Sequence, residues 1–379
     1  MKITRNPFIV KGYIDKTTFC DRENELNSLY INLQNGIDTT LISPRRLGKT
    51  GLILRFFEFI KDHNPEVASI YVDIYATRSL DDFVKLLVES ILKVFPEKSH
   101  VGKRFITLLK GLRPMIGYDS ISGEPRIQIA YQSPQEKEHT LKSILEFLDK
   151  QSALVVLAID EFQQINDYPE KNTEALLRTC LQTLKNIRFI FCGSKKDMMI
   201  DLFSNAKRPF YSSTKFISLD KIDKDIYADF IHDTFEKHHK RIDNESIEFI
   251  LNWTKQHTFY TQYLCNLVFT LSEENIHLNI VKEACVQILM QNETVYLQYR
   301  QLLTPSQWNF LIAVAKEDEV KQITSQKFIQ THRIGTPANA RRISKSLEEK
   351  ELLLVNFAKK SQSYQVYDVF FSRWLEREY

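Results

Sequence analysis

Residue types that bind phosphate occur together in the segment LISPRRLGKTGL, residues 41–52. The segment matches the pattern GxxxxGK[ST], except that Ser43 stands at the first glycine. In such a loop, backbone N–H groups and the start of the next helix cradle phosphate oxygens, the lysine reaches the terminal phosphates and the hydroxyl ligates Mg²⁺. A chance GKT tripeptide is the alternative, and the β-prone run before it and the helical period after it disfavour that alternative. The expected nucleotide-binding residues here are Ser43, Pro44, Arg45, Arg46, Leu47, Gly48, Lys49, Thr50 and Gly51.

Two adjacent carboxylates end the apolar run LVVLAIDEF. Such a run is typical of a strand buried on both faces of a parallel sheet. An acidic pair at its end is costly to bury unless a cation meets it, and ligands of open α/β sheets bind at this edge. We therefore expect Asp160 to hold Mg²⁺ and Glu161 to orient or deprotonate the attacking water. An ordinary ion pair at a strand end is the alternative.

Three further polar residues are candidates for the same site. Ser194 ends the run FIFCGS and is expected beside the Asp160 strand, where its hydroxyl would hold the water, sense the γ-phosphate or instead cap the next helix. Lys207 and Arg208 precede the last β-prone run. Both are candidates for a charge clamp on the γ-phosphate, from the same chain or a neighbouring subunit, and a solvated loop is the alternative.

Strand and helix patterns alternate through the first half of the chain. Five β-prone runs (TTLIS, ASIYVDIY, SALVVLAID, IRFIFCGS and TKFISL) are separated by helical patterns, which predicts an α/β fold with a mostly parallel sheet. An inserted hairpin is expected within residues 111–134. We predict three domains: a P-loop ATPase core over residues 1–222, a helical lid over 223–298 and a winged helix-turn-helix over 299–379.

The C-terminal part has three helical patterns followed by β-prone LLLVNFA and SYQVYDVFF, the plan of a winged helix. ANARRISKS lies on its expected recognition helix, and basic residues lie at its expected wing. Such side chains reach phosphates and base edges, although winged helices also dock proteins. The candidate nucleic-acid-binding residues are Asn339, Arg341, Arg342, Ser344, Lys345, Lys359 and Lys360.

Bulk composition is that of a globular protein. The chain has 379 residues, of which 43% are hydrophobic and 26% charged. A net charge of +3 is too small to indicate nucleic-acid binding by itself. The five cysteines are odd in number and lack CxxC spacing, which argues against a disulfide framework or a zinc site. We find no signal peptide and no membrane-length apolar run, and expect a cytoplasmic protein.

Several motifs together resemble one known family. NPF, FCDRENEL, SPRRLGKT, LAIDEF, FCGS, HTFYTQYLC and YDVFFSRWLE make the chain similar to the archaeal-type ATPase family of the AAA+/STAND superfamily. The resemblance implies an AAA+-like ATPase core, a helical lid and a C-terminal winged helix. It places Phe19, Arg22 and Glu23 near the adenine. The chain departs from the family at residues 256–258, where Gln-His-Thr replaces Gly-x-Pro of the lid motif.

These patterns favour an ATP-binding and hydrolysing switch with Mg²⁺ as cofactor and double-stranded DNA or a protein as partner. One alternative is a DNA-binding regulator that ATP merely stabilises, with negligible turnover. Another is a defence or toxin-like ATPase that acts through protein partners. Salt-dependent affinity for DNA distinguishes the last from the others.

Overall fold

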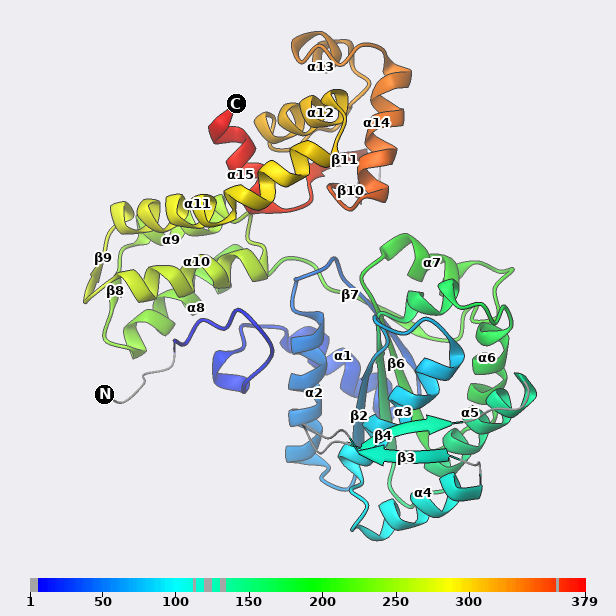
Figure 1. The fold of residues 1–379 in the computed structure, drawn as a ribbon. Helices are drawn as coiled ribbons and strands as arrows, with labels where there is room; N and C mark the ends of the chain where they lie inside the picture. Colours follow the sequence, from blue (N-terminus) through cyan, green and yellow to red (C-terminus); the bar gives the residue numbers. More distant parts are fainter. Residues whose placement is uncertain (1–5, 112–113, 119–124, 130–133, 359–360) are drawn as a thin grey trace. The chain divides into compact units, whose positions relative to one another are not determined.

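The protein is described by a computed structural model over residues 6–111, 114–118, 125–129, 134–358 and 361–379. It has two compact units. The core unit is Gly12–Lys221, and the helical unit is Ile222–Tyr379 with the N-terminal segment that ends at Lys11. Figure 1 shows the elements of each unit.

A five-stranded parallel sheet forms the centre of the core unit, as the alternating pattern predicted. Its order places β6 between the strand that precedes the phosphate loop, β1, and the strand that ends in the carboxylates, β5. The strands, in spatial order, are β2 (Ala68–Asp73), β5 (Val155–Asp160), β6 (Ile187–Gly193), β1 (Thr39–Ile42) and β7 (Lys215–Ser218).

Helices cover both faces of this sheet, which is why its three inner strands, β5, β6 and β1, are buried along nearly their whole length. One face packs against α1 (Glu23–Gln34) and α2 (Lys49–His63). The opposite face packs against α3 (Leu80–Val94), α4 (His100–Gly111), α5 (Pro134–Asp149), α6 (Thr173–Thr183) and α7 (Lys196–Ser204). Side chains of β5 alternate between the faces, with Val156 and Ala158 on the α2 side. Asp160, which continues this alternation, therefore also points toward α2.

Shorter elements complete the core unit. The predicted insertion is confirmed as an antiparallel hairpin of β3 (Pro114–Tyr118) and β4 (Pro125–Ile129). Two 3-10 helices, η1 (Lys16–Thr18) and η2 (Phe162–Asp167), precede α1 and follow β5.

Four helices form the first part of the helical unit. They are α8 (Lys224–Lys237), α9 (Asn244–Trp253), α10 (Thr258–Leu271) and α11 (Leu278–Leu302), with a two-residue parallel pair between β8 (Arg241–Ile242) and β9 (Asn275–Ile276). The N-terminal segment packs onto them. The Phe8 and Phe235 rings are tilted to each other with centroids 4.7 Å apart. The Asn6 side chain donates a hydrogen bond to the Asn266 carbonyl, and the Asn266 side chain donates one to the Phe8 carbonyl.

The winged-helix plan is also confirmed. Helices α12 (Pro305–Lys316), α13 (Gln326–Thr331) and α14 (Pro337–Glu349) precede an antiparallel ribbon of β10 (Leu353–Ala358) and β11 (Ser361–Val366). The strand predicted over SYQVYDVFF is wrong beyond Val366. A helix, α15 (Val369–Glu378), begins there because Asp368 caps it by accepting a hydrogen bond from the Phe371 amide.

The three-domain division stays a prediction. The segment that ends at Lys11 groups with the helical unit, and α11 runs through the boundary expected at residue 298. No described helix is long and apolar enough to span a bilayer.

An aromatic cluster joins β6 to α7 and to the segment that follows α7. Phe191 is fully buried, and its ring lies 5.2–5.4 Å from those of Phe203 and Phe210. We predict that Phe191→Ala lowers the free energy of unfolding of the core unit by about 3–5 kcal/mol, because it leaves a cavity. Urea unfolding followed by circular dichroism, with hydrogen exchange of the β6 amides, measures this. The matched control is Phe216→Ala, whose ring is 40% exposed; equal losses in both variants would contradict the prediction.

Candidate functional site

The phosphate loop connects β1 to α2 as the motif predicted. Gly48 adopts a left-handed conformation with φ of +94° and precedes the helix, whose first residue is Lys49. Glycine has no side chain with which to cap α2, and this is the helix start expected of an anion site. Ser43 is fully buried, and its amide donates to the Gly193 carbonyl on β6 over 3.3 Å. The small serine thus lets the loop start against the neighbouring strand.

The remaining loop residues differ in exposure. Pro44 and Arg45 are half-buried, Leu47 is buried and Arg46 is exposed with φ of +65°. The Arg45 guanidinium lies 5.7 Å from the centroid of the Tyr75 ring, which follows β2. The loop therefore brings positive charge to the carboxyl edge of the sheet.

Lys49 lies between the two carboxylates that end β5. Its ammonium is 2.9 Å from Asp160 Oδ1 and 3.1 Å from Glu161 Oε1, and the residue is 7% exposed. Burial disfavours the charged form of Lys49, but the two carboxylates outweigh it and raise the pKa of the lysine above its ordinary value. The three charges sum to −1 at the end of a buried strand, which attracts a further cation.

Glu161 is held by a set of donors. Ser194 Oγ donates to Glu161 Oε2 over 2.7 Å, Gln163 Nε2 donates to the same oxygen, and Glu161 itself has φ of +55°. Burial raises its pKa, but Lys49, Ser194 and Gln163 outweigh burial, so the pKa lies below its ordinary value. Ser194 thus contacts Glu161, and no side chain caps α7, which was the alternative role of Ser194.

Asp160 and Thr50 present oxygen atoms of the kind that Mg²⁺ binds. Thr50 Oγ1 donates its hydrogen to Asp160 Oδ2 over 2.9 Å, which leaves the lone pairs of the hydroxyl available to a metal. The hard oxygen donors and the net negative charge fit a divalent cation.

Two residues at this site were not predicted from the sequence. Tyr71 on β2 donates its hydroxyl hydrogen to Asp160 Oδ2 over 2.8 Å, and Gln163 contacts Glu161 as described. Gln163 leaves little room at Gly193, where an added Cβ would lie 2.5 Å from its Oε1. No motif marks either residue, because only the sheet order and the η2 turn bring them to the carboxylates.

The residues expected near the adenine lie before and at the start of α1. The Phe19 ring packs over the first turn of α2, 3.2 Å from where a Cβ at Gly51 would lie. Arg22 is buried, contacts Glu25 over 2.9 Å and donates to the Asp220 carbonyl over 2.6 Å, whereas Glu23 is exposed. Phe19 and Gly51 thus lie beside the phosphate loop, and their role toward adenine stays a prediction.

Arg208 does not join the Lys49 cluster in this structure. Its guanidinium contacts Glu174 over 3.2 Å, Asp201 over 3.3 Å and Asn166 over 2.6 Å. Lys207 beside it is exposed. A clamp on the γ-phosphate would require Arg208 to exchange these partners.

Most candidate nucleic-acid-binding residues lie on α14. Arg341, Arg342 and Lys345 are exposed. Asn339 instead donates to the Ile334 carbonyl over 2.9 Å, and Ser344 is buried and donates to the Arg341 carbonyl. Lys359 and Lys360 lie outside the described residues.

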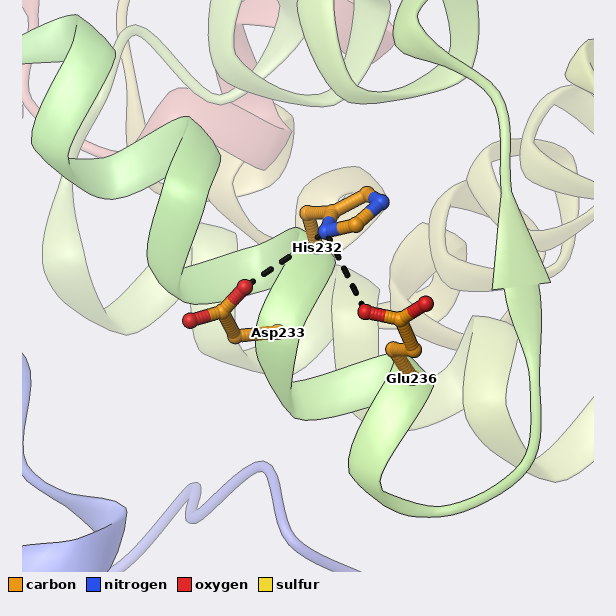
Figure 2. Close-up of side chains that lie close together, drawn as sticks. All are labelled: His232, Asp233 and Glu236. Carbon is orange, nitrogen blue, oxygen red and sulfur yellow. Dashed lines mark hydrogen bonds and ion pairs between the residues drawn. The ribbon is translucent and has the colours of Figure 1, made fainter.

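One other group of candidate metal ligands occurs among the described residues. His232, Asp233 and Glu236 lie close together on α8, with His232 Nδ1 3.5 Å from Asp233 and 4.0 Å from Glu236 (Figure 2). All three side chains are exposed, so solvent competes for them and we assign them no metal.

Two family models match the chain. The family described as an ATPase domain predominantly from Archaea matches residues 19–257, and one described as a probable winged helix domain matches residues 294–377. No curated protein matches the sequence.

Solved structures share the fold over nearly the whole chain. A Walker-type ATPase of Pyrococcus abyssi is 18% identical with a TM-score of 0.65, covering 97% of this chain and 99% of that one. The ORC2 protein of Aeropyrum pernix, in ADPNP–ADP complexes, is 14% identical with a TM-score of 0.60, covering 99% and 96%. The ORC1 protein of the same organism, in complex with DNA, is 10% identical with a TM-score of 0.51, covering 95% and 93%. At these identities the likeness shows the fold.

The ion pairs of Lys49 make a stability prediction. Replacing Lys49 by Met leaves Asp160 and Glu161 buried without their cation, and we expect the free energy of unfolding of the core unit to fall by about 3–5 kcal/mol. Denaturant unfolding at neutral pH without nucleotide measures this. The control is Lys142→Met, which removes an exposed ion pair 3.9 Å long to Glu146 and is expected to cost under about 1 kcal/mol. A Lys49→Met variant as stable as Lys142→Met would contradict the expectation.

Proposed function

The chain belongs to the family of ATPase domains found predominantly in Archaea, and from that premise we propose that it is a Mg²⁺-dependent ATPase that acts as a nucleotide switch for its winged helix. The contact of Lys49 with both Asp160 and Glu161 carries this proposal, since it joins the phosphate loop to the carboxylates expected to bind metal and activate water.

Nucleotide binding would redistribute the contacts of Lys49. The phosphates of ATP offer anionic partners at the α2 start, so the lysine would leave Glu161 for them. Because Lys49 holds the pKa of Glu161 down, this exchange makes Glu161 a stronger base. Glu161 thus stays a weak base while Lys49 pairs with it, and becomes a stronger base when a phosphate takes its place as the partner of Lys49.

The chemistry would be hydrolysis of the terminal phosphate. Water held by Glu161 and Ser194 attacks the γ-phosphorus, its proton passes to Glu161, and the bond to the bridging oxygen breaks to leave ADP. Mg²⁺, held by Thr50 and Asp160, would neutralise phosphate charge. Arg208 remains a candidate clamp on the γ-phosphate.

DNA is the partner that we propose for the helical unit. Exposed Arg341, Arg342 and Lys345 on α14 support it, and so does the ORC1 protein of A. pernix, which shares the fold and was solved with DNA. Nucleotide state would then alter the affinity for DNA. A protein-docking winged helix is the alternative outcome of the test below.

One test of the proposed function concerns nucleotide binding and turnover. Calorimetry with Mg·ATP and a phosphate-release assay should show binding and hydrolysis by the wild type. Lys49→Ala should lose binding, whereas Glu161→Gln should bind but lose turnover by about 10²–10⁴-fold, the usual contribution of a general base. Binding without turnover by the wild type would favour a structural nucleotide, and Lys49→Ala that binds normally would exclude the proposed site.

Another test concerns the affinity of the winged helix for DNA. Affinity for mixed duplex DNA should fall steeply with salt, because phosphate contacts release counterions. Each of Arg341→Ala, Arg342→Ala and Lys345→Ala should reduce the slope of log K against log salt by about 1. Arg241→Ala, an exposed arginine of the β8 pair, is the charge-matched control. A flat salt response in the wild type would favour a protein partner.

A further inference from the structure

The hydroxyl of Tyr71 contacts the proposed metal ligand from a strand outside the phosphate loop. Tyr71 lies on the edge strand β2, where it pairs in register with Ala158, two residues before Asp160. Its ring packs, half-buried, against the apolar cluster on the α2 face of the sheet. The hydrolytic steps proposed above do not use this residue.

Four contacts together fix the Asp160 carboxylate. Oδ1 meets Lys49 at 2.9 Å and accepts from the Glu161 amide over 2.9 Å. Oδ2 accepts from Thr50 over 2.9 Å and from Tyr71 over 2.8 Å. A carboxylate has about four lone-pair sites, so this set fills them, and Asp160 could accept a metal only once the contact with Lys49 is released.

These four contacts will not persist equally when nucleotide binds. Lys49 would turn to the phosphates, and the Thr50 hydroxyl would share its oxygen with the metal. The Glu161 amide and Tyr71 are then the donors that still hold the carboxylate without another task. Tyr71 is the one whose side chain is anchored on a neighbouring strand.

The phenol acts toward Asp160 as a donor only. The Tyr71 hydroxyl supplies one directed hydrogen bond to Asp160 Oδ2, and an ionised carboxylate can only accept it.

We propose that Tyr71 is a positioning residue for the divalent cation, orienting Asp160 so that its carboxylate and the Thr50 hydroxyl present their oxygens to the metal together. The inference rests on the proposed Mg²⁺-dependent nucleotide site. It adds to that site a residue that strengthens the binding of the metal and not the binding of the nucleotide. Groups that hydrogen-bond metal ligands typically contribute 10–100-fold to metal affinity.

The test separates metal binding from nucleotide binding in the full-length chain. Mn²⁺, a spectroscopic substitute for Mg²⁺, is titrated in the presence of ADP and followed by electron paramagnetic resonance. ADP binding is measured separately in EDTA. Tyr71→Phe keeps the ring and removes the hydroxyl, and we expect about 10-fold weaker Mn²⁺ binding with unchanged metal-free ADP affinity.

The matched control is Tyr30→Phe. Tyr30 also donates a hydrogen bond in the core unit, to Asn64 over 3.3 Å at the far end of α2. This variant should bind Mn²⁺ and ADP as the wild type does.

The outcomes distinguish the two proposals. Unchanged Mn²⁺ affinity in Tyr71→Phe, or an equal loss of metal-free ADP binding, overturns the positioning role while the nucleotide site stands. A wild type that binds neither ADP nor ADP-dependent Mn²⁺ overturns the proposed function and this role with it. Selective weakening of Mn²⁺ in Tyr71→Phe alone supports the role.

Discussion

A buried lysine between two carboxylates is the interaction on which the site depends. Lys49 contacts Asp160 and Glu161 at the end of a strand whose side chains are otherwise apolar and buried. The free-energy cost of desolvating each carboxylate is large, so an acid pair in such a place is stable only when a cation pairs with it. The lysine therefore holds the phosphate loop and the carboxylates in one cluster. It also leaves a net negative charge there, which is the electrostatic condition for a metal ion.

The sheet order and the alternation of β5 place that cluster. The strand β6 lies between β1 and β5, so the start of α2, which follows β1, is one strand away from β5. Lys49 and Asp160 can meet because Asp160 points to the face of the sheet that α2 covers. The same strand delivers Ser194 to Glu161, while the edge strand β2 delivers Tyr71 to Asp160. Gln163 arrives through the 3-10 turn that follows β5, beside Gly193, where a larger residue would clash. Neighbouring strands thus surround each carboxylate with donors that do not belong to the phosphate loop.

In the helical unit, charge and ring contacts join the helices α8–α11 to the winged helix. Arg373 on α15 donates to the Trp253 carbonyl over 3.0 Å, Lys255 meets Asp318 at 2.8 Å, and Phe370 packs against Trp253 and Tyr260. Lys255 lies after α9 and Asp318 after α12, so these contacts bridge the two parts. Side-chain contacts therefore join the two parts of the helical unit.

The sequence by itself determined the local chemistry and the order of the elements. Spacing predicted that Lys49, Thr50, Asp160 and Glu161 belong to one site, and the structure brings the four together. The prediction was possible because a phosphate loop is a contiguous motif and an acid pair at the end of an apolar run is visible without a structure. The sequence predicted the parallel sheet and the winged helix for the same reason: apolar periodicity is local. Only the tertiary structure decided which side chains surround these residues. Tyr71 and Gln163 belong to no motif. Arg208 is placed by its ion pairs to Glu174 and Asp201. The helix α15 replaces an expected strand because its apolar residues pack on α11 and α12. Contacts between distant segments depend on strand order and packing, which a linear pattern does not encode.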